Sequence, residues 1–134
     1  MAIEPLPEYE HKEKVIQADT LFEKIKQADS SNCLDQNKEA MLTIIDFRAS
    51  NFVESGSPVH SIKTDCKIIK CLLDDFSKPE VRSRIPKKGL VVLVCETGNR
   101  AWAAKRYLSQ YGFTNIVNLK FGMRAWIKAG YPLQ

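Results

Sequence analysis

The sequence predicts one α/β domain with a mainly parallel central sheet and helices on both faces. Compact apolar runs alternate with segments of helical periodicity, which is the pattern of strand–helix–strand units. The chain has 134 residues, of which 44% are hydrophobic, so it can bury one core without disulfide or metal cross-links. We expect residues 15–134 to form this domain and residues 1–14, which are rich in charge and contain two prolines, to form a polar arm.

The first half of the chain predicts two strands separated by a helix. Val15 and Ile16 are expected to form a short strand, and Asp19 is placed to cap the helix that follows. The apolar residues of that helix recur at helical spacing and are Leu21, Phe22, Ile25 and Ala28. Residues 29–39 are polar and predict a loop. The run MLTIIDFR, residues 41–48, predicts a strand that is buried on both faces.

The second half predicts two further strands and three helices. Residues 55–58 mark a turn, and a helix is expected from Asp65 until Pro79 interrupts it. Its apolar set, at helical spacing, is Ile68, Ile69, Leu72, Leu73 and Phe76. The remaining elements follow in order: a buried strand at 90–94, a helix from about Asn99 to Gly112, a strand at 116–119, and a helix at 123–129 closed by Gly130 and Pro132.

Composition excludes several classes of function. The N-terminus lacks an apolar leader, and no segment approaches the roughly 20 apolar residues that span a bilayer, so we expect a soluble, cytoplasmic protein. Cys33, Cys66, Cys71 and Cys95 lack paired CxxC spacing, which predicts neither a zinc site nor a disulfide framework and fits a reducing compartment. The net charge of +4 is spread among acids, which argues against nucleic-acid binding and fits a small anionic substrate.

The stretch CETGNR, residues 95–100, joins the buried strand at 90–94 to the next helix. Ligands of open α/β sheets bind beyond the carboxyl ends of the strands, where Cys95 is expected. Five residues should form a ring of inward-facing amides around its sulfur: Glu96, Thr97, Gly98, Asn99 and Arg100. With the N-terminus of the following helix, this ring favours a nucleophilic thiolate. The alternative is an inert cysteine that ends a core strand.

These residues resemble a family. CETGNR is similar to the active-site loop Cys-x-x-Gly-x-Arg of single-domain rhodaneses, which are sulfurtransferases. IIDFR, residues 44–48, resembles the family's strand ending in Asp-x-Arg, and YGF, residues 111–113, resembles its turn after the second helix. NLKFGMRAWIKAGYP, residues 118–132, is similar to its closing Gly-Gly, Trp and Gly-Tyr-Pro segment. The resemblance extends over about residues 15–132 and implies a rhodanese fold.

The chain departs from the family pattern at two places. The family usually follows Asp-x-Arg with Gly-His-Ile-x-Gly-Ala, whereas this chain has SGSPVHSI at residues 55–62, with Pro58 near the expected histidine. We therefore give the displaced His60 no catalytic role. Phe121 stands where the first glycine of the closing pair is expected, so the backbone beside the loop could be reshaped.

The resemblance implies a sulfurtransferase that needs no metal or organic cofactor. The Cys95 thiolate would take a sulfane sulfur from thiosulfate or a persulfide, hold it as a persulfide within the loop, and pass it to cyanide or a thiol. Donor and acceptor are small molecules or a protein, and neither nucleic acid nor membrane is a partner. Asp46 and Arg48 would support the loop. Glu96 is expected to point outward, with no nearby loop residue offsetting its charge.

Two alternatives to this function remain. Phosphatases and arsenate reductases of the same fold have one more residue in the loop than the four that separate Cys95 from Arg100, and the shorter ring suits one sulfur atom better than a phosphate. A non-catalytic rhodanese-like module for protein binding or regulation is the second alternative. The divergent residues 55–62 favour it, and retention of Cys95, Gly98 and Arg100 opposes it. Cys66 and Cys71, both on the expected helix, read as core or surface thiols, of which one could resolve the persulfide.

Overall fold

The computed structural model describes residues 15–48, 61–96 and 99–134, and it describes Asn99 and Arg100 by their backbone alone. The predicted arm at 1–14, the turn at 55–58 and His60 lie outside the described residues. The strands are β1 Val15–Ile16, β2 Leu42–Asp46, β3 Lys67–Lys70, β4 Leu90–Val94 and β5 Ile116–Leu119. The helices are α2 Ala18–Asp29, the 3-10 helix η2 Leu73–Ser77, α3 Pro79–Arg82, α4 Asn99–Ser109 and α5 Gly122–Lys128.

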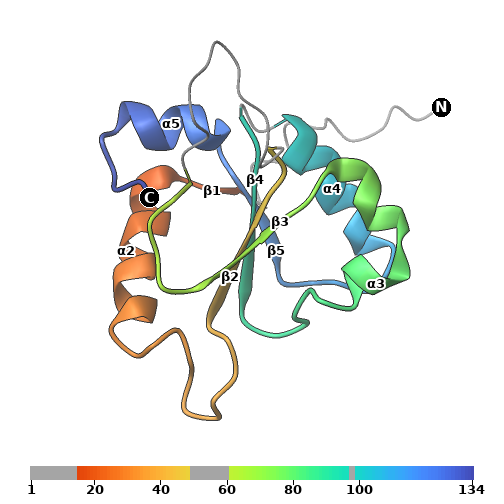
Figure 1. Cartoon of the computed structure of the whole chain (residues 1–134), viewed down its shortest axis with the longest axis horizontal. Coiled ribbons are helices and arrows are strands. Elements are labelled where there is room, and N and C mark those ends of the chain that lie inside the picture. Colours follow the sequence, from red (N-terminus) through yellow and green to blue (C-terminus); the bar gives the residue numbers. More distant parts are fainter. Residues whose placement is uncertain (1–14, 49–60, 97–98) are drawn as a thin grey trace, which may run out of the picture.

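The described strands form a parallel five-stranded sheet in the order β1-β5-β4-β2-β3 (Figure 1). Helices α2 and α5 cover one face, and α3, η2 and α4 cover the other. Successive side chains of a strand alternate between the two: Ile44 and Val92 pack toward α2 and α5, whereas Ile45 and Leu93 pack toward α4. The predicted α/β class, with helices on both faces of the sheet, is therefore confirmed.

The helix expected from Asp65 to Pro79 is wrong at its start, because residues 67–70 form strand β3. Ile68 and Ile69 are paired with β2 and pack on opposite faces of the sheet. The apparent helical period arises from two isoleucines of a short strand followed by the apolar residues of η2. A helix there would leave the backbone groups at the outer edge of β2 without a partner strand. Pro79, expected to interrupt a helix, instead begins α3 as its first residue.

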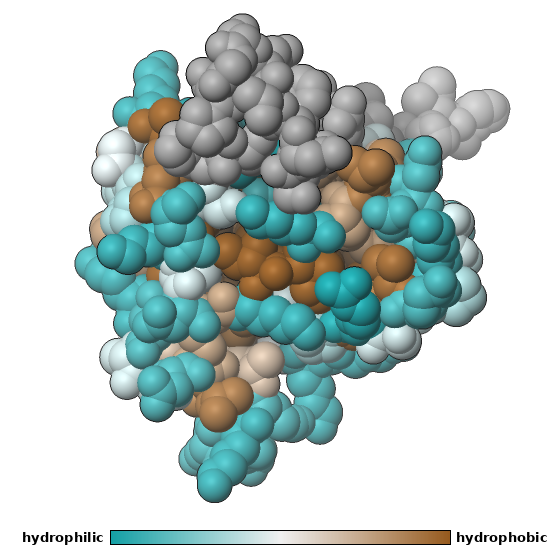
Figure 2. Space-filling view, viewed as in Figure 1, coloured by the Kyte–Doolittle hydropathy of each residue, from teal (hydrophilic) through white to brown (hydrophobic). Residues whose placement is uncertain are grey.

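Strand β3 forms one edge of the sheet, and lysines occupy both of its ends. Lys67 and Lys70 are exposed, and charged side chains on an edge strand oppose pairing with another chain. Figure 2, in the view of Figure 1, shows a largely hydrophilic surface with an apolar patch near its centre. No helix in the described part of the chain is long and apolar enough to cross a membrane.

Two further expectations about the N-terminal region are wrong. Asp19 does not cap α2, which begins one residue earlier at Ala18, so its carboxylate lies in the first turn and accepts a hydrogen bond from Thr20 N at 2.7 Å.

Cys33 and Cys66, expected as unpaired thiols, form a disulfide with Cα atoms 5.3 Å apart. The fold brings together residues 33 positions apart, which spacing alone does not reveal. Disulfides persist in oxidising compartments, so the cysteines no longer argue for a reducing one.

Phe121 adopts a left-handed backbone conformation, with φ 61° and ψ 11°, immediately before α5. This is a conformation that glycine adopts readily and that costs other residues roughly 1–2 kcal/mol. The side chain is 64% exposed, so burial offsets little of that cost. The position expected to hold the family's glycine thus keeps a glycine-type backbone although it carries a phenylalanine.

Replacing Phe121 by glycine or by alanine should therefore give proteins of different stability. We expect Phe121→Gly to exceed Phe121→Ala in free energy of unfolding by about 1 kcal/mol, because alanine keeps the left-handed cost. Urea unfolding measures this difference. The matched control is Ile127, which is 46% exposed within α5. There, Ile127→Gly should be less stable than Ile127→Ala, because glycine is unfavourable inside a helix. Equal stability of the two Phe121 variants would contradict the left-handed assignment.

Candidate active site

Cys95 lies directly after β4, the central strand of the sheet, at its carboxyl end. Its side chain faces the α4 side and is 3% exposed, in a cluster that includes Leu93, Ala101 and Ala104. Helix α4 begins four residues later at Asn99, as expected from the sequence. The predicted position of the cysteine, between a buried strand and a helix N-terminus, is the one observed.

The first turn of α5 holds the backbone at the start of the loop. Met123 N donates to Cys95 O at 2.8 Å, and Arg124 N donates to Glu96 O at 3.1 Å. Gly122 has a left-handed φ of +61°, and a Cβ there would lie 2.6 Å from Glu96 O and closer still to Cys95 O. Glycine is therefore required at this position for two independent reasons. The loop is anchored at Cys95 and Glu96 by residues that lie 28 positions further along the chain.

Sequence reasoning missed this anchoring role of Gly122, Met123 and Arg124. The signal was present in the closing segment, where one glycine of the expected pair is retained. A glycine directly before the expected helix at 123–129 indicates a close approach to another backbone. What the sequence does not show is which backbone it approaches.

Asp46 and Arg48, predicted to support the loop, are brought together at the end of β2. The buried Asp46 carboxylate accepts hydrogen bonds at Oδ1 from Arg48 N at 2.9 Å and Nε at 3.2 Å, and at Oδ2 from Nη2 at 3.0 Å. Arg48 Nη1 also lies 3.9 Å from Glu96 Oε1. Arg48 therefore connects the end of β2 with the residue that follows Cys95. Its support of catalysis stays a prediction.

Glu96 lies at the rim of the site, with a side chain that is 59% exposed. This agrees with the expected outward orientation. The sequence led us to expect that no nearby loop residue offsets its charge; the Arg48 guanidinium, which lies outside the loop, stands between Glu96 and Asp46. The neighbouring cation comes from two residues beyond the end of β2, a position that the loop sequence alone does not reveal.

The rest of the predicted loop is described only in part. Thr97 and Gly98 lie outside the described residues, and Asn99 and Arg100 contribute the first backbone turn of α4. The proposed ring of amides and the role of Arg100 therefore stay predictions.

Cys71 is not placed to resolve a persulfide on Cys95. It follows β3, and its N–H donates to Asp46 O at 3.2 Å. Strand β2 separates β3 from β4, so two strand spacings, roughly 10 Å, lie between the backbones of the two cysteines. Disulfide formation requires Cα atoms within about 7 Å. Burial is the main cause that raises the pKa of the Cys71 thiol to about 11, and the nearby Asp75 carboxylate acts in the same direction.

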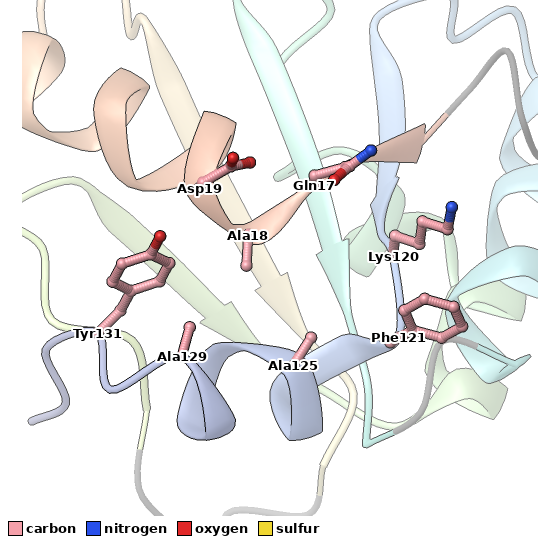
Figure 3. A pocket seen from close by; sticks show the side chains of 8 residues that line it. All are labelled: Gln17, Ala18, Asp19, Lys120, Phe121, Ala125, Ala129 and Tyr131. Carbon is pink, nitrogen blue, oxygen red and sulfur yellow. The ribbon is translucent and has the colours of Figure 1, made fainter.

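Two surface cavities in the described part of the chain are not lined by Cys95. One, of about 270 Å³, lies between the start of α2 and α5, with Phe121, Ala125 and Tyr131 among its lining residues (Figure 3). The other, of about 380 Å³, lies between η2 and α4 and is lined in part by Leu73 and Tyr107. The first is bordered by the residue that precedes the Gly122 anchor.

Comparisons with known proteins agree with this geometry. A family model described as "Rhodanese-like domain" matches residues 29–129. A protein named "Sulfurtransferase" from Allochromatium vinosum is 33% identical over 78 residues, which cover 54% of this chain and 73% of that protein. The crystal structure of a rhodanese-related protein from Thermoplasma volcanium is 26% identical with a TM-score of 0.64, over 90% of this chain and 97% of that one.

A rhodanese-like domain from Anabaena sp. shares the fold, with a TM-score of 0.65 at 18% identity, over 90% of this chain and 78% of that one. The residues matched by the family model include β2 to β5, the cysteine loop and α5.

The raised pKa of Cys71 predicts slow alkylation at neutral pH. In Cys95→Ser, the rate of Cys71 modification by iodoacetamide should rise with pH up to about 11, because the reactive thiolate forms only there. Peptide mass spectrometry follows the reaction, and circular dichroism verifies that the fold persists. The same variant unfolded in urea is the control and should show its rise nearer the ordinary thiol value. If the alkylation rate of the folded protein rose at the same pH as that of the unfolded control, burial of the Cys71 thiol would be contradicted.

Proposed function

This chain belongs to the rhodanese-like domain family, and from that membership we propose that it is a sulfurtransferase that carries the transferred sulfur on Cys95. The observation that carries the proposal is the buried Cys95 at the carboxyl end of the central strand, with its carbonyl held by the Met123 amide. A cysteine that served packing alone would not need the following backbone to be anchored by a second helix. The similarity to a sulfurtransferase at 33% identity supports the same reaction class.

The reaction proceeds in two displacements at sulfur. The Cys95 thiolate attacks the outer sulfur of a donor such as thiosulfate, an S–S bond forms, and the donor's own S–S bond breaks so that sulfite leaves with its electron pair. An acceptor thiolate or cyanide then attacks the outer sulfur of the Cys95 persulfide. The products are an acceptor persulfide or thiocyanate, and the Cys95 thiolate is regenerated. Neither step requires a redox cofactor.

The charges around Cys95 suit anionic sulfur species. The N-terminus of α4, an 11-residue helix, carries the positive end of its dipole close behind the loop. Arg48 adds a cation that is shared between the buried Asp46 and the exposed Glu96. Backbone amides of residues 96–100 would stabilise the negative charge of the persulfide. The four residues between Cys95 and Arg100 favour this cargo over a phosphate.

Sulfur loading of Cys95 is the direct test. After incubation with thiosulfate or polysulfide, the intact mass of the wild type should increase by one sulfur, and cyanide should release it as thiocyanate. Cys95→Ser should acquire no cyanide-labile sulfur, whereas Cys71→Ser should load like the wild type. If the wild type carries no persulfide with any sulfane donor, a binding or regulatory module becomes the better account. An adduct retained by Cys95→Ser would place the sulfur elsewhere.

Donor preference should depend on Glu96. Glu96→Gln removes a negative charge at the rim and leaves Arg48 to attract the donor, so kcat/KM for dianionic thiosulfate should rise several-fold at low ionic strength and fall back as salt is added. A neutral persulfide donor should be nearly unaffected. Glu23→Gln, an equal charge change on the exposed side of α2, is the control and should alter neither donor. Equal, salt-independent changes for both donors would mean that Glu96 acts on loop structure instead.

A further inference from the structure

We propose that Asp29, Cys33 and Cys66 form a redox-controlled binding site for a thiophilic divalent cation, with Zn²⁺ as the chemically matched ion. The disulfide is the oxidised state of this site, and the metal occupies the reduced state. Cys66 precedes the amino end of β3, whereas Cys95 follows the carboxyl end of the parallel strand β4. The site therefore lies at the opposite end of the sheet from Cys95 and is independent of sulfur transfer.

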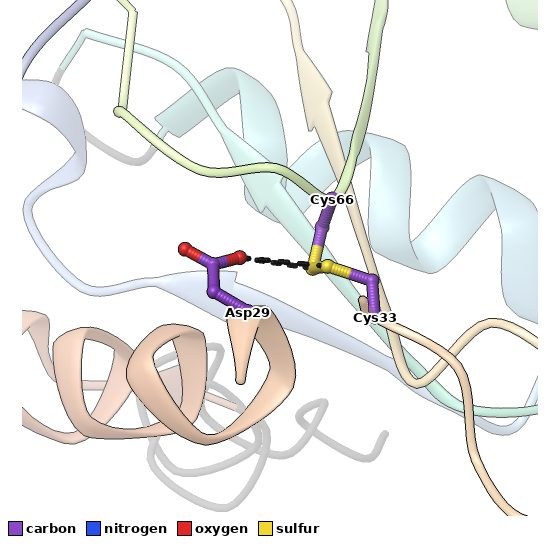
Figure 4. A group of neighbouring side chains, drawn as sticks. All are labelled: Asp29, Cys33 and Cys66. Carbon is purple, nitrogen blue, oxygen red and sulfur yellow. Dashed lines mark hydrogen bonds between the residues drawn. A yellow bond between two sulfur atoms is a disulfide. The ribbon is translucent and has the colours of Figure 1, made fainter. Parts of the chain in front are cut away.

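Three separate segments bring their ligand atoms to this point (Figure 4). Asp29 is the last residue of α2, Cys33 lies in the turns that follow, and Cys66 stands directly before β3. The carboxylate oxygen and the two sulfur atoms lie within 4.8 Å of one another. Both cysteines are buried, at 6% and 5% exposure, while Asp29 is half-exposed. The cluster thus has two interior thiol ligands and a carboxylate at the solvent boundary.

The carboxylate already stands at the distance that a tetrahedral metal site requires. Asp29 Oδ1 lies 3.5 Å from Cys33 Sγ and 3.6 Å from Cys66 Sγ. With Zn–S bonds of about 2.3 Å and a Zn–O bond of about 2.1 Å, the O···S edge of a regular tetrahedron is about 3.6 Å. Both observed separations match this edge. Only the separation of the two sulfur atoms has to change.

Reduction makes that change. A thiol or phosphine reductant supplies two electrons, and two protons are taken up, so that the Cys33–Cys66 bond opens into two thiols. Non-bonded sulfurs then separate toward the roughly 3.8 Å that forms the S···S edge of a zinc tetrahedron. Zn²⁺ displaces the two thiol protons and gains two thiolates and one carboxylate, with water as the fourth ligand on the half-exposed side of Asp29. Thiolate ligands favour Zn²⁺ over Mg²⁺ or Ca²⁺.

Neighbouring polar groups hold the carboxylate in place. Asp29 Oδ1 accepts hydrogen bonds from Thr64 Oγ1 at 2.8 Å and from Asp65 N at 3.1 Å, and Thr64 Oγ1 in turn accepts one from Cys66 N at 3.0 Å. Such outer-shell bonds orient metal ligands and contribute to affinity. They also fix Asp29 relative to Cys66 whether or not the disulfide is present. In either redox state, the end of α2 therefore remains connected to the start of β3.

The test uses the full chain as Cys71→Ser/Cys95→Ser, in which Cys33 and Cys66 are the remaining thiols. The protein is reduced with a phosphine, desalted under anaerobic conditions and titrated with Cd²⁺ and, in competition with a chromophoric chelator, with Zn²⁺. We expect one metal ion per chain, with a cadmium–thiolate charge-transfer band, and an increase in Tm on addition of Zn²⁺. The disulfide form should bind neither ion.

The ligand assignment is tested in the same background. Asp29→Asn should weaken Zn²⁺ binding by about tenfold or more, and the matched Asp65→Asn should not, because Asp65 contacts the site through its backbone N–H. Cys33→Ser should remove the charge-transfer band, with circular dichroism verifying the fold. Reduced protein that binds Cd²⁺ and Zn²⁺ no better than the disulfide form overturns the proposal. Equal affinities of Asp29→Asn and Asp65→Asn would remove Asp29 from the ligand set.

Discussion

The close approach of Gly122 to the carbonyl groups of Cys95 and Glu96 is the constraint on which the candidate site depends. Without a side chain at Gly122, the first turn of α5 can present the Met123 and Arg124 amides to these two carbonyls. The orphan N–H groups at the start of a helix are thereby satisfied by the loop, and the carbonyls at the start of the loop are satisfied by the helix. One contact thus provides hydrogen-bond partners for both the helix and the loop, and it fixes the position of the Cys95 backbone.

The sheet determines which side chains can act together at that position. Because its strands are parallel, Asp46 and Cys95 lie at the same end of the sheet, at the carboxyl ends of neighbouring strands. Arg48 uses this proximity to join a buried carboxylate to an exposed one, so a cation stands between the two negative charges. The same parallel order puts the disulfide at the opposite end of the sheet, near the amino ends of the strands. A change in its redox state is therefore separated from Cys95 by the full length of the strands.

The sequence was most informative where local pattern and tertiary environment agree. The run Leu90–Val94 is apolar throughout because both faces of a central strand are buried, and its bounds are those expected. Strand β3 was missed because four residues are too few to establish a period, and its pairing with β2 is what makes it a strand. The disulfide and the Arg48–Glu96 contact were missed for a related reason. Both join segments whose proximity exists only after the chain has folded.

The last residues of the chain complete the segment that leads into β3. Ser61 N donates to Gln134 O at 3.1 Å, Gln134 N donates to Ser61 O at 2.9 Å, and Lys63 N donates to Pro132 O at 3.1 Å. These residues are synthesised after all the other described ones, so this short antiparallel pairing cannot form while the rest of the domain emerges from the ribosome. Contacts between residues so distant in sequence are among the slowest to form during folding. The segment that leads into β3 is therefore held by residues that are translated well after it.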